Sequence, residues 1–163
     1  MFLLAFNRAV EVYARENVES LTFQPIPSVA KGYYELGAHR IVLNSRLNES
    51  EKAKTLIHEL AHAKMHGENS PYRDTTIREK EMQAEMTAYV VAKSFGLDPA
   101  DESIHYVANW TGKFAEIEDV ERNLAAIQKT AREMIQGIDT YYGLELEREA
   151  EKSTIENESG IPV

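Results

Sequence analysis

His58-Glu59-Leu60-Ala61-His62, a His-Glu-x-x-His motif, lies inside a helix-compatible run from Asn48 to Gly67. Residues i and i+4 share one face of an α-helix, so His58 and His62 can direct imidazole nitrogens at one metal ion. Zinc requires such nitrogens at ~2.0–2.1 Å. Glu59 lies beside the first ligand, where it can take a proton from metal-bound water. The motif therefore predicts a zinc-dependent peptidase.

The competing interpretation of the motif is a chance pair of core or surface histidines that hold no metal. Two features of the surrounding sequence favour a metal site over such a chance pair. A pair of carboxylates follows downstream, and the flanking residues suit a largely buried helix under an active site. The apolar members of that helix are Leu56, Ile57, Leu60, Ala61, Ala63 and Met65.

Length and composition limit the alternatives. The chain has 163 residues and no cysteine. This length predicts one domain with a single core. The lack of cysteine excludes disulfides and thiolate zinc ligands, so any metal ligands are His, Asp or Glu. The sequence contains no run of ~18 apolar residues, so no membrane span is predicted. The apolar start, residues 1–6, is too short for a secretory signal. We therefore expect a cytoplasmic protein.

The charge is acidic and unevenly distributed. A net charge of −9 argues against direct nucleic-acid binding, which depends on basic surface. Residues 145–163 hold six glutamates against Arg148 and Lys152. We expect residues 1–144 to form a single domain and residues 145–163 to form an acidic, flexible tail.

Hydrophobic periodicity and capping residues predict several helices. Asn48 and Glu51 have the spacing of a capping box at the start of the motif helix, and Gly67 suits a left-handed position after its end. Gly96 marks the end of the next helix. The predicted ranges are 2–16, 49–66, 75–95 and 117–141, and a further helix is expected to open at Asp98-Pro99.

Before the motif, the sequence predicts a small β-structure. Residues 21–23 suit a short strand, and the β-rich runs 29–34 and 40–43 suit a hairpin that turns near Gly37. We expect Arg40–Asn44 to be an edge strand that could hold an extended substrate by β-augmentation.

The third metal ligand is sought on the helix predicted over 75–95, because a catalytic zinc keeps three protein ligands and one water. The candidates are Glu79, Glu81 and Glu85. Glu81 and Glu85 share a face, whereas Glu79 lies on another side and is interpreted as solvated surface. We assign Glu81 as the metal ligand. We expect Glu85 to accept a hydrogen bond from the outer N–H of a ligand histidine, which is the ring N–H that faces away from the metal. Periodicity alone allows the reverse.

In the expected mechanism, zinc lowers the pKa of its bound water toward ~7. Glu59 takes the proton as the water attacks a peptide carbonyl and passes it to the leaving amine. A second donor for the oxyanion is left open among four tyrosines, which are Tyr33, Tyr34, Tyr89 and Tyr106.

The remaining histidines are given supporting or structural roles. His66 lies one turn beyond His62, near the helix end, so we expect it to cap the helix or to support the site rather than to bind the metal. His39 and His105 are interpreted as ordinary surface or core residues.

Several stretches together resemble the zinc-metallopeptidase domain of ArdC-type anti-restriction proteins. That domain is similar to the ImmA/IrrE metallopeptidases of mobile elements, phages and stress responses. The resemblance covers residues 28–110. Its motifs are Gly32-Tyr33-Tyr34, Arg40–Asn44, Lys54–Ala63, Glu81-x-x-Ala84-Glu85-x-x-Ala88-Tyr89-Val90-Val91 and Gly96-Leu97-Asp98.

This resemblance implies an α+β, mostly helical fold of the small zincin (minigluzincin) type, with a small sheet or hairpin before the motif helix. It implies a cytoplasmic zinc metallopeptidase that cuts a protein partner. DNA-binding repressors and other regulators of a mobile element or phage are the candidate substrates. By analogy with gluzincins, Glu81 is the metal ligand and Glu85 stands where a supporting Asp stands.

The chain departs from these relatives in two ways. Gln83 occupies a position where relatives often carry Glu, and zinc binding would be impaired if that position supplied the ligand. ArdC proteins also have an N-terminal single-stranded-DNA-binding domain without a counterpart in these 163 residues, so we do not expect DNA binding.

An alternative function is a non-catalytic zincin-like binding module that blocks a host enzyme, with the acidic surface imitating DNA. The presence of Glu59 favours the enzyme, because a pure binding module has no need of that acid.

Overall fold

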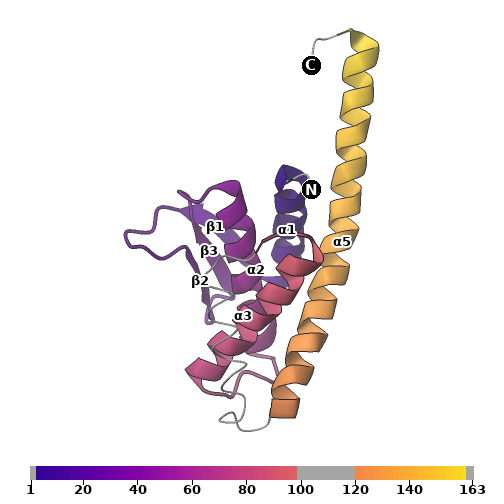
Figure 1. Ribbon diagram of the computed structural model, residues 1–163. Coiled ribbons are helices and arrows are strands. Elements are labelled where there is room, and N and C mark those ends of the chain that lie inside the picture. The colour runs from indigo at the N-terminus through magenta and orange to yellow at the C-terminus, as the bar shows by residue number, and fades with distance from the viewer. Residues whose placement is uncertain (1–2, 99–119, 161–163) are drawn as a thin grey trace.

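The computed structural model describes residues 3–98 and 120–160. Its fold is α+β and mostly helical, as expected. Figure 1 shows the small sheet on one side and the long helix α5 on the other, with α1, α2 and α3 between them. In chain order the elements are α1 (Leu3–Asn17), β1 (Ser20–Gln24), β2 (Gly32–Glu35), β3 (Arg40–Asn44), α2 (Glu49–His66), α3 (Ile77–Ser94) and α5 (Val120–Ser159). The helix expected from Asp98-Pro99 lies outside the described residues.

The three strands lie in the order β1-β3-β2, with β1 parallel and β2 antiparallel to β3. The predicted hairpin is confirmed, but the expectation that Arg40–Asn44 forms an edge strand is wrong. Ile41, Val42 and Leu43 are all fully buried. Such a continuous apolar run suits a strand covered on both faces and paired on both sides. The outer strands are β1 and β2.

The hairpin turn includes Gly37, but its left-handed residue is His39, with φ 46°. Two contacts hold His39 in this uncommon conformation. The Tyr34 hydroxyl lies 2.6 Å from His39 Nδ1, and the Glu19 N–H donates to the His39 carbonyl at 2.9 Å. The turn is therefore held by β2, through Tyr34, and by the residue that precedes β1, Glu19.

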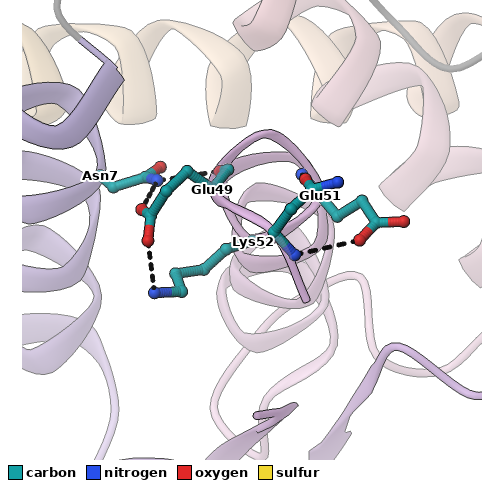
Figure 2. Close-up of polar contacts among 5 residues, drawn as sticks. Asn7, Glu49, Glu51 and Lys52 are labelled. Carbon is teal, nitrogen blue, oxygen red and sulfur yellow. Dashed lines mark hydrogen bonds and ion pairs between the residues drawn. The ribbon is translucent and has the colours of Figure 1, made fainter. Parts of the chain in front are cut away.

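The motif helix α2 begins with the predicted capping box. The Asn48 side chain accepts from the Glu51 N–H at 2.9 Å, and the Glu51 carboxylate accepts from the Asn48 N–H at 3.1 Å. Figure 2 shows that the same helix end is bound to α1, because the Asn7 side chain donates to the Glu49 carboxylate at 2.6 Å. Lys52 donates to the other oxygen of Glu49 at 3.2 Å. These contacts define where the motif helix starts.

Gly67 follows the end of α2, but the expected left-handed conformation is wrong. Its φ is −66° and its ψ is 164°, which is extended backbone. A Cβ here would lie 2.8 Å from the Ala63 carbonyl oxygen and 3.6 Å from a ring carbon of His39. Glycine is therefore needed for close approach rather than for a positive φ. Gly96, after α3, does adopt a positive φ of 76°.

Helix α5 is longer than predicted, since it continues through Gly143 to Ser159. Residues 145–159 of the expected tail are helical, which suits their content of helix-forming Glu. Residues 150–160 are all exposed, and Figure 1 shows this end of α5 extending past the rest of the molecule. Met134 and Ile138, nearer the start, are fully buried in the core. Flexibility of the acidic segment stays a prediction.

Candidate metal centre

The two motif histidines face one carboxylate of α3. Glu81 Oε1 lies 3.1 Å from His62 Nε2, and Glu81 Oε2 lies 3.7 Å from His58 Nε2. One potential ligand atom from each of these residues lies within 4.8 Å of the other two. Two imidazole nitrogens and one carboxylate oxygen form a donor set of catalytic zinc sites, which keep the fourth position open. The donor set therefore fits zinc.

Glu85 lies behind His58 rather than in this cluster. Its Oε2 is 2.9 Å from His58 Nδ1. A carboxylate accepts here, so Nδ1 carries the proton, and Nε2 of a neutral ring keeps its lone pair on the side of Glu81. Glu79 is directed elsewhere, since its carboxylate accepts from the Thr75 hydroxyl. Glu81 therefore faces both motif histidines and Glu85 contacts one of them from behind, while the roles of the glutamates toward a metal stay predictions.

The charges of the cluster suit a bound cation. Burial opposes a charge on His58, but the hydrogen bond with Glu85 and the nearby carboxylates outweigh it and raise its pKa. Hydrogen bonding with His62 lowers the pKa of Glu81. Glu81 is therefore ionised at neutral pH, which is the form that binds a metal.

Glu59 lies next to this cluster and is buried, with 8% of its surface exposed. Burial raises its pKa, although His58 and His62 act in the opposite direction. The Tyr34 backbone on β2 also favours the ionised carboxylate, but this smaller effect does not cancel the rise in pKa. A positioned carboxylate with a raised pKa is a stronger base than an exposed one. The geometry therefore suits general-base chemistry at this position.

His66 contacts His62 from behind and lies outside the cluster. The two Nδ1 atoms are 2.9 Å apart. His66 Nε2 lies 2.8 Å from the side-chain oxygen of Gln83, whose amide nitrogen donates to Asn123 Oδ1 at 2.5 Å. Burial lowers the pKa of His66 to about 4, so its ring is neutral at pH 7. Gln83 faces His66, which means that Glu81, not position 83, meets the motif histidines.

Sequence reasoning missed Asn123, because it lies on α5, forty residues beyond Gln83. Local periodicity carries no signal for a contact at that separation. Gln83 was noticed only as a departure from relatives. Its position two residues from both Glu81 and Glu85 places it on another side of α3, where it reaches His66.

A cleft of about 450 Å³ opens over the cluster. Gly32, Tyr33 and Tyr34 of β2 line it together with His58, Glu59, His62 and Glu81. Lys80, which the sequence analysis did not single out, also lines it. Of the tyrosines considered as oxyanion donors, Tyr33 and Tyr34 lie at the cleft, Tyr89 is not among its lining residues and Tyr106 lies outside the described chain. The motif helix and an outer strand thus share one cleft.

Comparison with known proteins identifies the family. Residues 16–111 match the IrrE N-terminal-like domain of peptidase family M78. The chain belongs to peptidase family M78. The matched range contains all three strands, α2 and α3, and hence the three candidate metal ligands His58, His62 and Glu81. The predicted resemblance of this M78 domain to the ImmA/IrrE proteins is therefore confirmed, and its family is one of peptidase-like proteins.

The M78 chain is also similar to an uncharacterized protein of Bacillus anthracis. The two are 36% identical over 122 residues, which cover 75% of this chain but 20% of the relative. No solved structure matches the chain. None of the described helices has both the length and the apolar character that a bilayer span requires.

Proposed function

We propose that this protein is a zinc-dependent metalloendopeptidase that hydrolyses a protein substrate. The observation that carries the proposal is the convergence of His58, His62 and Glu81 within 4.8 Å, in a cleft that also holds Glu59. Membership of a peptidase family supports the same conclusion. The donor set and the adjacent acid together suit hydrolysis of a peptide bond.

Each residue has a distinct role in the proposed reaction. His58, His62 and Glu81 would hold zinc, which when bound supplies Lewis acidity for activating water and polarising a carbonyl. Glu59 accepts a proton from the attacking water and donates it to the leaving amine.

We propose that the substrate binds along the outer edge of β2, and not along β3 as the sequence suggested. The Asn44 N–H donates to the Lys31 carbonyl at 2.8 Å. Backbone bonding alternates along an antiparallel pair, so the backbone groups of Gly32 and Tyr34 point away from β3. Both residues line the cleft. An extended peptide can therefore be bound along this edge by β-augmentation.

The family resemblance supports a DNA-binding repressor or another regulatory protein of a mobile element or phage as the substrate, and the cytoplasm as the place of action. Peptidase activity can be tested without knowing this partner. A proteome-derived peptide library, incubated with zinc-loaded protein and analysed by mass spectrometry, reports any cleavage and its sequence preference.

Glu59→Gln is the decisive variant. We expect wild type and Glu59→Gln to bind one zinc each, because Glu59 is not a ligand. Only wild type should cut peptides, and the variant should lose about 10²–10⁴-fold in rate. Chelation should abolish wild-type cleavage and added zinc should restore it. Equal cleavage by both proteins would refute the role of Glu59.

The same variant separates the enzyme from a binding module. If zinc-loaded wild type cuts nothing in the library, and wild type and Glu59→Gln act alike on a host target, the peptidase proposal fails. Glu59→Gln also serves as a trap for the natural substrate, because it should bind without cutting.

A further inference from the structure

The two motif histidines are supported from behind by groups of different kinds. His58 rests on the Glu85 carboxylate at 2.9 Å. His62 instead contacts a second imidazole, that of His66, at 2.9 Å. Beyond His66 the contacts continue to Gln83 and Asn123, at 2.8 and 2.5 Å. We refer to His66, Gln83 and Asn123 as the buried polar chain, since each has at most 5% of its surface exposed.

The far end of the buried polar chain determines where its protons lie. The Gln83 amide nitrogen donates to Asn123 Oδ1, which turns the Gln83 oxygen toward His66. An amide oxygen can only accept, so the proton of His66 lies on Nε2. The other ring nitrogen, Nδ1, then carries a lone pair and faces His62.

The metal end requires the same arrangement. His62 binds a cation through Nε2 only if that atom is unprotonated, and its proton then lies on Nδ1. This outer N–H needs an acceptor, and His66 Nδ1 is 2.9 Å away. The reverse polarity would aim a His66 N–H at His62 and leave the outer N–H of a bound His62 without an acceptor.

We propose that Gln83 and Asn123 are positioning residues of the zinc site, which act through His66 on His62. They hold His66 in the tautomer whose Nδ1 accepts the outer N–H of metal-bound His62. The inference rests on the proposed zinc site but not on peptidase activity. It also makes α5, through Asn123, a part of the metal centre.

Two substitutions remove successive parts of the buried polar chain. Gln83→Met keeps the length of the side chain but removes the acceptor for His66. Asn123→Leu removes the acceptor that orients Gln83, whereas Asn123→Asp keeps an acceptor oxygen. Thr87→Val is the matched control, because Thr87 is fully buried on the same helix and donates to Met65 Sδ rather than to the buried polar chain.

Two readouts other than activity test the inference. Zinc affinity is measured by competition with a chelator, and the tautomer of His66 by ¹⁵N NMR with and without zinc. Losing a partner behind a ligand histidine typically costs ~10–100-fold in metal affinity. We expect such a loss for Gln83→Met, a smaller one for Asn123→Leu, and mixed His66 tautomers in both. Asn123→Asp and Thr87→Val should keep wild-type affinity and the Nε2-protonated tautomer.

Wild-type zinc affinity together with an unchanged His66 tautomer in Gln83→Met and Asn123→Leu would overturn the inference. So would a wild-type His66 protonated on Nδ1. If Gln83→Met does not fold, the zinc affinities and His66 tautomers of Asn123→Leu and Asn123→Asp test the inference, and equal values in the two variants would overturn it. A protein that shows these effects but cuts no peptide retains this inference and loses the peptidase proposal.

Discussion

At the residue scale, the chemistry of the site depends on how α3 presents its glutamates. Glu81 meets both motif histidines, Glu85 lies behind His58, and Glu79 bonds to Thr75. The separation of these roles follows from the helix itself. Residues four apart share a face, so the two nearby carboxylates reach the same histidine from different sides.

This arrangement predicts a graded response to three alanine substitutions. Glu81→Ala should lose zinc most severely, because it removes a ligand. Glu85→Ala should weaken zinc binding by about 10–100-fold, and Glu79→Ala should bind zinc like wild type. Metal content after dialysis, followed by chelator competition, measures all three. Stoichiometric zinc in Glu81→Ala with none in Glu85→Ala would transfer the ligand role to Glu85.

At the element scale, the start of α2 is bound to α1 through Glu49. The hydrogen bond from Asn7, followed by that from Lys52, lowers the pKa of Glu49. A carboxylate whose pKa is lower in the folded state stabilises the fold above its unfolded pKa. This stability is lost as pH falls through the folded pKa. The bond between α1 and α2 should therefore weaken in acid, below the ordinary Glu pKa of 4.5.

Glu49→Gln tests this pH dependence. At pH 7 we expect a loss of about 0.5–1 kcal/mol of unfolding free energy, a modest value because 40% of the side chain is exposed and screened by water. The difference should disappear as pH falls below 4.5. Glu51→Gln is the control, since Gln also completes a capping box. Urea unfolding at several pH values measures both, and a constant difference down to pH ~3 would contradict the assignment.

The packing of α1 against α5 depends on a glycine. A Cβ at Gly137 would lie 2.2 Å from Cε2 and 2.6 Å from Cδ2 of Tyr13, whose ring is buried. We expect Gly137→Ala to destabilise the protein by about 1–3 kcal/mol through overpacking. At Gly143, on the same helix, an added Cβ meets nothing within 4 Å. Gly143→Ala should therefore stabilise by about 0.5–1 kcal/mol. Shifts of the same sign in thermal unfolding would refute this contrast.

At the scale of the whole molecule, α5 divides into a buried part and a part without core contacts. Ile138 is fully buried, whereas residues 150–160 are all exposed. A chain that ends after Glu149 should keep its unfolding free energy within ~0.5 kcal/mol. Its zinc affinity should be unchanged, because Asn123 and the cluster are retained.

A chain that ends after Gly137 is the control for this truncation. It lacks Ile138, and deletion of such a buried side chain costs about 2–5 kcal/mol or more. Hydrogen exchange of the full chain should also show little protection over residues 150–159. Strong protection there, or marked destabilisation by the shorter truncation, would show that this segment contributes to the folded domain.

Much of the fold could be predicted because its signals are local. The Asn48–Glu51 capping box and the positions of α1, α2 and α3 were expected from neighbouring residues. Errors arose where distant parts of the chain decide the outcome. Arg40–Asn44 became the central strand because β1 pairs with it on one side and β2 on the other.

Hydrogen bonds and side-chain spacing within a helix involve residues at most four apart. The motif helix, its cap and the shared face of His58 and His62 could therefore be predicted from local sequence. Three features could be seen only in the folded molecule: how α3 is turned toward that face, which strand borders the cleft, and that Asn123 of α5 meets Gln83. Those contacts join residues far apart in the chain. They are set by packing of whole elements around the core, for which local periodicity carries no information.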